Sequence, residues 1–167
     1  MHDRFQAAIL EALFASLHPR WRKLPEVPVR RPARGYIDAV LADSLVGTVV
    51  ATECQSQIRR LEQQLRWAHD KADSLPSSEA WAFLSPEDAA PPNISRLLLL
   101  RSTAATREIA RAYHLTLAAT YPARTADAYA ALTSDAPWTG PAILWARVEN
   151  GQARILGCPP RGVTVGR

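Results

Sequence analysis

Cysteine and lysine each occur only twice in this 167-residue chain. The two cysteines, Cys54 and Cys158, are too few for a disulfide framework or for a metal site built from cysteines. Lysine occurs only at positions 23 and 71, so 18 of the 20 basic residues are arginines. A lysine with a chemical role can therefore be one of only two residues, Lys23 or Lys71.

Long apolar runs and nucleotide-binding motifs are also missing. Apolar runs such as Leu97–Leu100 fall far short of the ~20 residues that a membrane span needs. The first residues lead into an amphipathic segment and not into the apolar stretch of a signal peptide. The chain has neither a glycine-rich phosphate loop nor a nucleophile elbow. We therefore expect a soluble, cytoplasmic protein with no membrane partner.

The overall composition is that of a folded domain. Hydrophobic residues make up 47 % of the chain and charged residues 22 %, which is enough apolar material for a normal core. The length corresponds to about one domain. We expect a single domain over residues 1–157 and a flexible tail over residues 158–167.

Hydrophobic periodicity predicts alternating helices and strands. Apolar residues at three- and four-residue steps predict helices over residues 3–18 and 56–74, and Asn150-Gly151 is a strong hairpin signal. Further helices are predicted from 103 to about 114 and at 125–133, and strands at 26–30, 35–41, 48–55, 94–101, 115–121, 142–148 and 152–156. This order predicts an α/β fold with a mixed central sheet, an αβββαβ core, helices on both faces and a C-terminal β-hairpin.

Two carboxylates and an amide are candidates for chemistry. Asp38 lies in the middle of the strand at 35–41, and Glu53 and Gln55 lie near the end of the strand at 48–55. Side chains alternate along a strand, so Glu53 and Gln55 share a face, and a hairpin turn near 43–47 brings Asp38 beside Glu53. Carboxylate oxygens gathered in this way suit Mg²⁺, which binds one or two carboxylates together with waters and a substrate phosphate.

These segments resemble the core of the PD-(D/E)xK nuclease superfamily. The resemblance covers residues 3–115 and is carried by the segments IDAVL and ATECQSQIRRLEQQL, which are also similar to domains attached to helix-turn-helix regulators in actinobacteria. It implies a restriction-endonuclease-like fold and Mg²⁺- or Mn²⁺-dependent hydrolysis of phosphodiester bonds in DNA. By position, Asp38 and Glu53 would hold the metal and Gln55 would take the place of the motif lysine. Glu11 on the first helix is a candidate for the additional acid that some members have.

The sequence departs from this pattern at Gln55, because a neutral amide orients water but supplies no positive charge. We expect Lys71 to lie far along the helix from Gln55, and Lys23 to lie in a loop before the sheet. Arg59 and Arg60, in the expected first turn of that helix, are better placed to contact a phosphate.

Alternatives to a nuclease follow from the same residues. Asp38 could instead cap a turn or form an ion pair with Arg59. The basic residues Arg30, Arg31 and Arg34 either contact DNA phosphates or form a solvated loop. With Gln55 in the lysine position, the chain could also be a catalytically degenerate module that binds DNA or a regulatory protein without cleavage. Sequence specificity would then come from a homodimer or from a separate DNA-reading partner.

Overall fold

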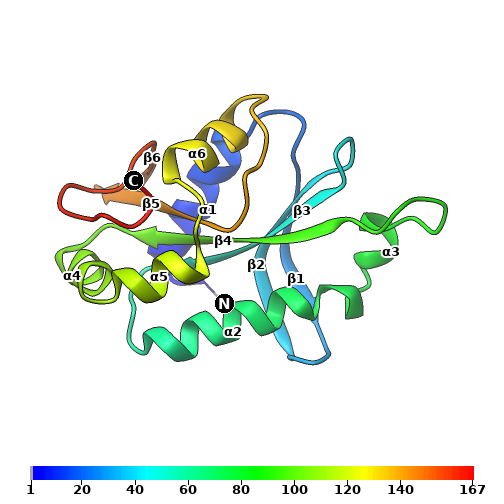
Figure 1. Cartoon of the computed structure of the whole chain (residues 1–167), viewed down its shortest axis with the longest axis horizontal. Coiled ribbons are helices and arrows are strands. Elements are labelled where there is room, and N and C mark those ends of the chain that lie inside the picture. The colour runs from blue at the N-terminus through cyan, green and yellow to red at the C-terminus, as the bar shows by residue number, and fades with distance from the viewer. Residues whose placement is uncertain (1) are drawn as a thin grey trace. The chain divides into compact units, whose positions relative to one another are not determined.

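The structure, a computed structural model, describes residues 2–167 and contains a six-stranded sheet with the strand order β1-β2-β3-β4-β5-β6 (Figure 1). β4 and β5 are parallel, whereas the pairs β1–β2, β2–β3 and β5–β6 are antiparallel. The predicted mixed α/β fold is therefore confirmed. The strands are β1 (Arg22–Val29), β2 (Gly35–Asp43), β3 (Thr48–Gln55), β4 (Asn93–Arg101), β5 (Ala142–Glu149) and β6 (Gln152–Leu156). The helices are α1 (Arg4–Ser16), α2 (Leu61–Asp73), the 3₁₀ turn η1 (Leu75–Ser77), α3 (Trp81–Leu84), α4 (Ala104–Ala112), α5 (His114–Thr120) and α6 (Thr125–Thr133).

The chain forms two compact units. Unit 1 contains the chain up to His18, residues 54–59 and residues 97–167. Unit 2 contains residues 19–53 and 60–96. None of the helices within residues 2–167 has both the length and the apolar character that crossing a membrane requires.

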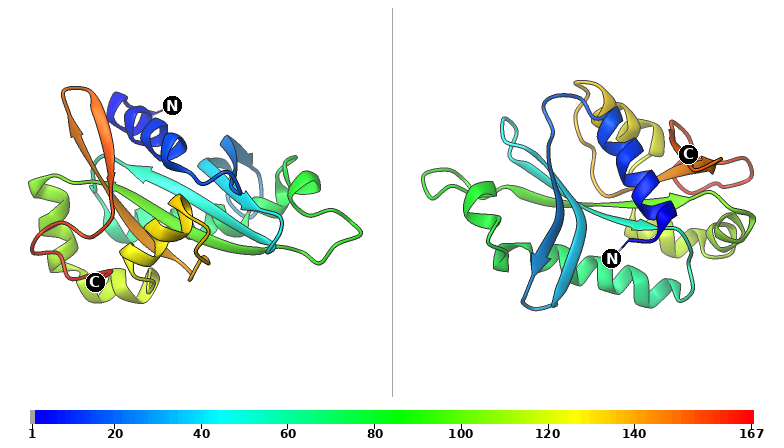
Figure 2. Two further views of the ribbon diagram at one scale, coloured as in Figure 1. Left: turned by 90° about the horizontal axis from the view of Figure 1, so that it is seen from above. Right: turned by 180° about the vertical axis from the view of Figure 1, so that it is seen from behind.

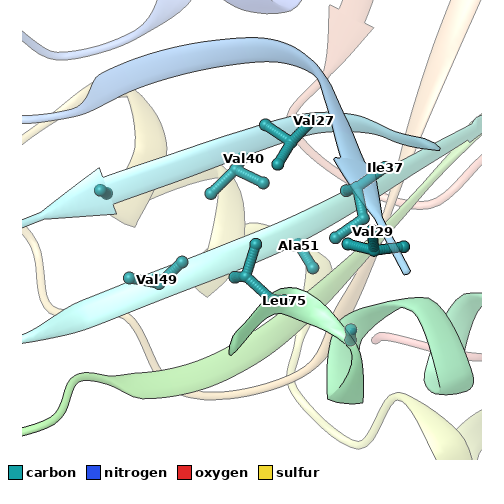
Figure 3. Close-up of a cluster of buried hydrophobic side chains, with 9 residues drawn as sticks. Val27, Val29, Ile37, Val40, Val49, Ala51 and Leu75 are labelled. Carbon is teal, nitrogen blue, oxygen red and sulfur yellow. The ribbon is translucent and has the colours of Figure 1, made fainter. Parts of the chain in front are cut away.

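The core of unit 2 lies between the hairpin of β2 and β3 and the helical segment α2–η1. Val40 of β2 and Val49 and Ala51 of β3 are buried on the sheet face that Leu75 covers (Figure 3). α2 contributes a buried stripe at three- and four-residue steps, formed by Leu61, Leu65, Ala68 and Ala72. Burial of this stripe stabilises α2, which has no side-chain cap at its first residue.

The predicted start of the helix at residue 56 is wrong, because α2 begins at Leu61. Residues 56–60 form an irregular connection between β3 and α2. A strand cannot continue directly into a helix that packs back on the sheet, and connections of about 2–6 residues are usual at such points. Arg59 and Arg60 therefore precede the helix.

Unit 1 contains a strand that is buried on both faces. All five residues of β5 from Ala142 to Ala146 are buried, so side chains on both sides of this strand are covered. α1 packs against β5 and β6, and α6 packs against β5 (Figure 2). The hairpin predicted at Asn150-Gly151 is confirmed, with both residues at positive φ, 51° and 76°.

The strand predicted at 115–121 is wrong, because this segment forms the helix α5. Of its residues only Leu117 is buried, whereas Leu115 is 76 % exposed. Leu115 and Leu117 alternate in the sequence like strand residues, but only one of them contacts the core. The C-terminal segment, residues 158–167, forms no helix or strand, and Val163 and Val165 within it are buried.

The first helix begins with a capping box. The Asp3 carboxylate accepts a hydrogen bond from the backbone N–H of Gln6 at 2.8 Å, and the Gln6 side chain accepts one from Asp3 N–H at 2.9 Å. Asp3 also accepts a hydrogen bond from the Ser56 hydroxyl. Such caps satisfy backbone donors that otherwise have no partner inside the helix.

We predict that Asp3→Ala lowers the free energy of unfolding by about 1–2 kcal/mol, because it removes both the cap and the acceptor for Ser56. Urea denaturation followed by circular dichroism measures this. Glu11→Ala, an exposed change on the same helix, serves as the control and should change stability by less than about 0.5 kcal/mol. Equal effects of the two changes would contradict the prediction.

Candidate active site

Asp38 and Glu53 are neighbours on adjacent strands of unit 2. The β2–β3 ladder pairs Asp43 with Thr48 and continues to Ala39 opposite Thr52. The next positions along this register are Asp38 and Glu53, so their side chains lie on the same face of the hairpin. The arrangement predicted from strand alternation is therefore confirmed.

Glu53 is buried against a lysine. The residue is only 4 % exposed, and its Oε2 atom is 2.7 Å from Lys71 Nζ. Lys71 is itself 7 % exposed and also donates to the backbone carbonyl of Tyr36 at 2.8 Å. Asp38 is half-buried. Unit 2 therefore brings two carboxylates and an ammonium group together on one sheet face.

Lys71, expected to lie far along the helix from Gln55, contacts Glu53. α2 packs against β2, so the last turns of this helix lie over the strand that carries Asp38. Figure 1 shows α2 crossing β1 and β2. The sequence did contain a signal for this contact. Lys71 lies three residues after Ala68, within the apolar stripe of α2, and a lysine at a buried helix position requires a polar partner.

Burial and the Lys71 charge have opposite effects on the pKa of Glu53. Burial, first, and the nearby Asp38 carboxylate, second, raise the pKa of Glu53 to about 8, although Lys71 lowers it. Near neutral pH this carboxyl therefore holds a proton to a large extent. Two carboxylates with one ammonium group leave one excess negative charge, which this proton neutralises.

The two carboxyl groups also interact with each other. Glu53 Oε2 bonds to Lys71, and a side-chain hydrogen bond between Glu53 and Asp38 helps to raise the pKa of Glu53. Carboxylate oxygens with the charge of a second carboxylate beside them suit Mg²⁺. Within residues 2–167 no group of three or more His, Cys, Asp or Glu side chains could hold a metal ion, and Asp38 and Glu53 alone would be a two-carboxylate site. Such a site depends on substrate and water for its remaining ligands.

The remaining residues singled out in the sequence are Gln55, Glu11 and Lys23. Gln55 is the last residue of β3, two positions after Glu53, and is half-buried. Glu11 is exposed on α1 in unit 1. Lys23, predicted in a loop, is an exposed residue of β1.

The predicted DNA-contacting arginines are exposed, but some have partners within the chain. Arg30 lies 3.2 Å from the Glu79 carboxylate, and Arg59 donates to the Gln57 side chain at 3.3 Å. Arg31, Arg34 and Arg60 are exposed.

Two exposed aromatic residues lie beside the lysine. Trp67, one helical turn before Lys71, is 51 % exposed, and Tyr36, whose carbonyl accepts from Lys71, is 62 % exposed. Gly35 lies next to both Lys71 and Trp67, since a Cβ atom there would be 3.7 Å from Lys71 Cδ and 3.9 Å from Trp67 Cζ2. No motif in the sequence marks either aromatic residue as part of a site.

Comparison of the chain with protein-family models, with curated proteins and with solved structures finds no match. Inferences about function therefore depend on the geometry of Asp38, Glu53 and Lys71.

We predict that ionisation of Glu53 makes the protein less stable as pH rises. The pKa of Glu53 is about 8 in the folded chain, whereas its ordinary value is 4.5. Between these two pH values the folded state therefore binds more protons than the unfolded state. The stabilising effect of this proton is full below about pH 4.5 and is lost by about pH 8, with at most a tenfold change in the unfolding equilibrium per pH unit.

Glu53→Gln removes this titration, and Gln can still accept a hydrogen bond from Lys71. Urea denaturation at pH 5 and pH 9 should show a smaller loss of stability in the variant than in the wild type. Glu79→Gln, at an exposed carboxylate, should retain the wild-type pH profile. Identical profiles for the wild type and Glu53→Gln would show that Glu53 is ionised throughout.

Proposed function

We propose that this protein is a Mg²⁺-dependent nuclease of the PD-(D/E)xK type that hydrolyses phosphodiester bonds in DNA. The observation that carries the proposal is the contact between Lys71 and Glu53 beside Asp38. This contact brings the two acidic residues of the β2–β3 hairpin together with a lysine of α2, the helix that follows the hairpin. The order of elements and the segments IDAVL and ATECQSQIRRLEQQL support the same proposal.

Asp38 and Glu53 are the residues that would hold the metal. The excess negative charge of the pair fits a divalent cation. A bound Mg²⁺ supplies charge to a phosphate and lowers the pKa of a bound water. Binding requires Glu53 to lose its proton, so metal affinity should rise with pH.

Lys71, and not Gln55, is the residue that supplies positive charge. Its ammonium group is fixed by Glu53 and by the Tyr36 carbonyl, so its position is set before a substrate binds. It holds Glu53 in place and adds a positive charge to a site that would receive a phosphodiester. Gln55 would orient water through its amide. The exposed rings of Trp67 and Tyr36 beside Lys71 offer surfaces on which unpaired bases could stack.

The second candidate function is a module that binds DNA or a regulatory protein without cleaving. The burial of Glu53 and Lys71 favours it, because both ends of this ion pair are shielded from an incoming substrate. In this case the pair would stabilise unit 2, and metal binding would be absent.

We predict that Asp38→Asn and Glu53→Gln each abolish Mg²⁺- or Mn²⁺-dependent cleavage of DNA. Each change keeps the shape of the side chain but removes a charge that a divalent cation requires. A fluorescent DNA substrate measures cleavage, and isothermal titration calorimetry with MnCl₂ measures metal binding. Glu53→Gln should be inactive while more stable than the wild type at pH 9, so a loss of folding cannot explain its inactivity. Wild-type protein that neither binds Mn²⁺ nor cleaves DNA would leave the non-cleaving module as the function.

We predict a different result for the two lysines. Lys71→Met should reduce cleavage by about a hundredfold or more, because a positioned charge at a developing anion contributes ~3 kcal/mol. Lys23→Met, at the other lysine of the chain and on the exposed side of β1, should leave cleavage unchanged. Lys71→Arg tests whether a loss of folding causes the effect, since it retains the charge. Full activity of Lys71→Met would assign the lysine a structural role alone.

A further inference from the structure

The positive charge of the chain is concentrated in unit 1. Unit 2 carries ten basic and ten acidic residues, whereas unit 1 carries ten arginines and six carboxylates. The whole formal charge of +4 therefore belongs to unit 1, which does not contain Asp38, Glu53 or Lys71. A charge asymmetry of this kind indicates a binding surface for an anionic ligand.

Four of these arginines line one open cavity. Arg107 and Arg111 of α4, Arg147 of β5 and Arg161 of the C-terminal segment surround a cavity of about 520 Å³. None of its lining residues within the described chain is acidic. Its volume lies in the range of small-molecule sites, roughly 300–1,000 Å³. Without an anion, four guanidinium groups around one cavity repel one another.

Two of the arginines are held in place by the fold. Arg107 donates to the Ser102 hydroxyl at 3.0 Å, and Arg111 donates to the carbonyl of Gly162 at 3.2 Å. Gly162 permits this contact in two ways. Its φ of +84° is one that favours glycine, and a Cβ atom there would lie 3.0 Å from an Arg111 guanidinium nitrogen. The guanidinium groups are thus partly ordered before a ligand arrives, which lowers the entropic cost of binding.

The strand side of the cavity also has unbalanced positive charge. Arg147 lies directly opposite Arg154 in the β5–β6 ladder, and like charges in such a pair destabilise a sheet. The nearby carboxylate of Glu149 is 4.0 Å from Arg147 Nε, and both side chains are exposed. An anion in the cavity would offset this repulsion.

We propose that this cavity binds linked phosphate groups, as found in an oligonucleotide strand or a polyphosphate. Guanidinium groups pair with phosphate oxygens through two parallel hydrogen bonds, which makes arginine suited to phosphate. The remaining lining residues, Ser102, Pro160 and Gly162, include no aromatic side chain on which a base could stack. Recognition is therefore by phosphate, independent of base sequence. The site does not depend on the proposed cleavage, because it lies in unit 1.

The test is binding of a fluorescein-labelled single-stranded oligothymidylate, followed by fluorescence anisotropy in EDTA at several salt concentrations. The double variant Arg107→Gln/Arg111→Gln should weaken binding by about tenfold or more. It should also reduce the slope of log K against log salt by about 1.4, that is ~0.7 for each phosphate that the protein no longer neutralises. Gly162→Ala should weaken binding without removing a charge, because it displaces the Arg111 guanidinium.

The matched control is Arg4→Gln/Arg124→Gln, which removes the same charge from exposed positions of unit 1 outside the cavity. Competition with inorganic tripolyphosphate separates the two ligand sources. Displacement of the oligonucleotide by tripolyphosphate shows that linked phosphates suffice, and failure to displace it identifies the nucleic-acid strand as the ligand. The proposal would be overturned if the Arg107→Gln/Arg111→Gln variant and the control weakened oligonucleotide binding equally. It would also be overturned if the wild type bound neither the oligonucleotide nor tripolyphosphate at low salt.

Discussion

The contact between Lys71 and Glu53 is the constraint on which the organisation of unit 2 depends. Glu53 lies on a sheet face that is otherwise filled by Val40, Val49 and Ala51. An ionised carboxylate in such a place is strongly unfavourable without a partner. Lys71 provides that partner only when α2 lies across the hairpin with its last turns over β2. The hydrogen bond between Lys71 and Glu53 thus ties the last turns of α2 to the β2–β3 hairpin, whichever protonation state Glu53 adopts.

Such a pair is weak evidence for stability. Replacing a buried ion pair with apolar residues of similar volume is often neutral or stabilising. Asp38 makes the arrangement less favourable still, because it adds a second negative charge and helps to raise the pKa of Glu53 to about 8. An apolar residue at position 53 would continue the core formed by Val49 and Ala51. The presence of two carboxylates and a lysine at this point is therefore easier to explain by chemistry than by folding.

The sequence predicted those parts of the molecule that depend on neighbours along the chain. Strand alternation placed Asp38 and Glu53 on one face, and the Asn150-Gly151 pair located the last hairpin, because both signals act within a few residues. Lys71 was missed for a different reason. Its position depends on the direction of α2, which is set by the irregular residues 56–60 and by packing against β2. Helical periodicity predicts which residues share a face of α2 but not where that face lies.

The arginine cavity could not be predicted from the sequence for a related reason. Its walls come from α4, β5 and the segment around Gly162, which are far apart in the chain. No local pattern marks Arg107 or Arg161 as partners, whereas the run around Arg30 and Arg31 is conspicuous because its members are adjacent. Yet Arg30 lies against Glu79, and its charge is partly compensated. A cluster of four arginines that folds together from distant segments, with only one exposed carboxylate nearby, indicates an anionic ligand more strongly than basic residues that are merely adjacent in sequence.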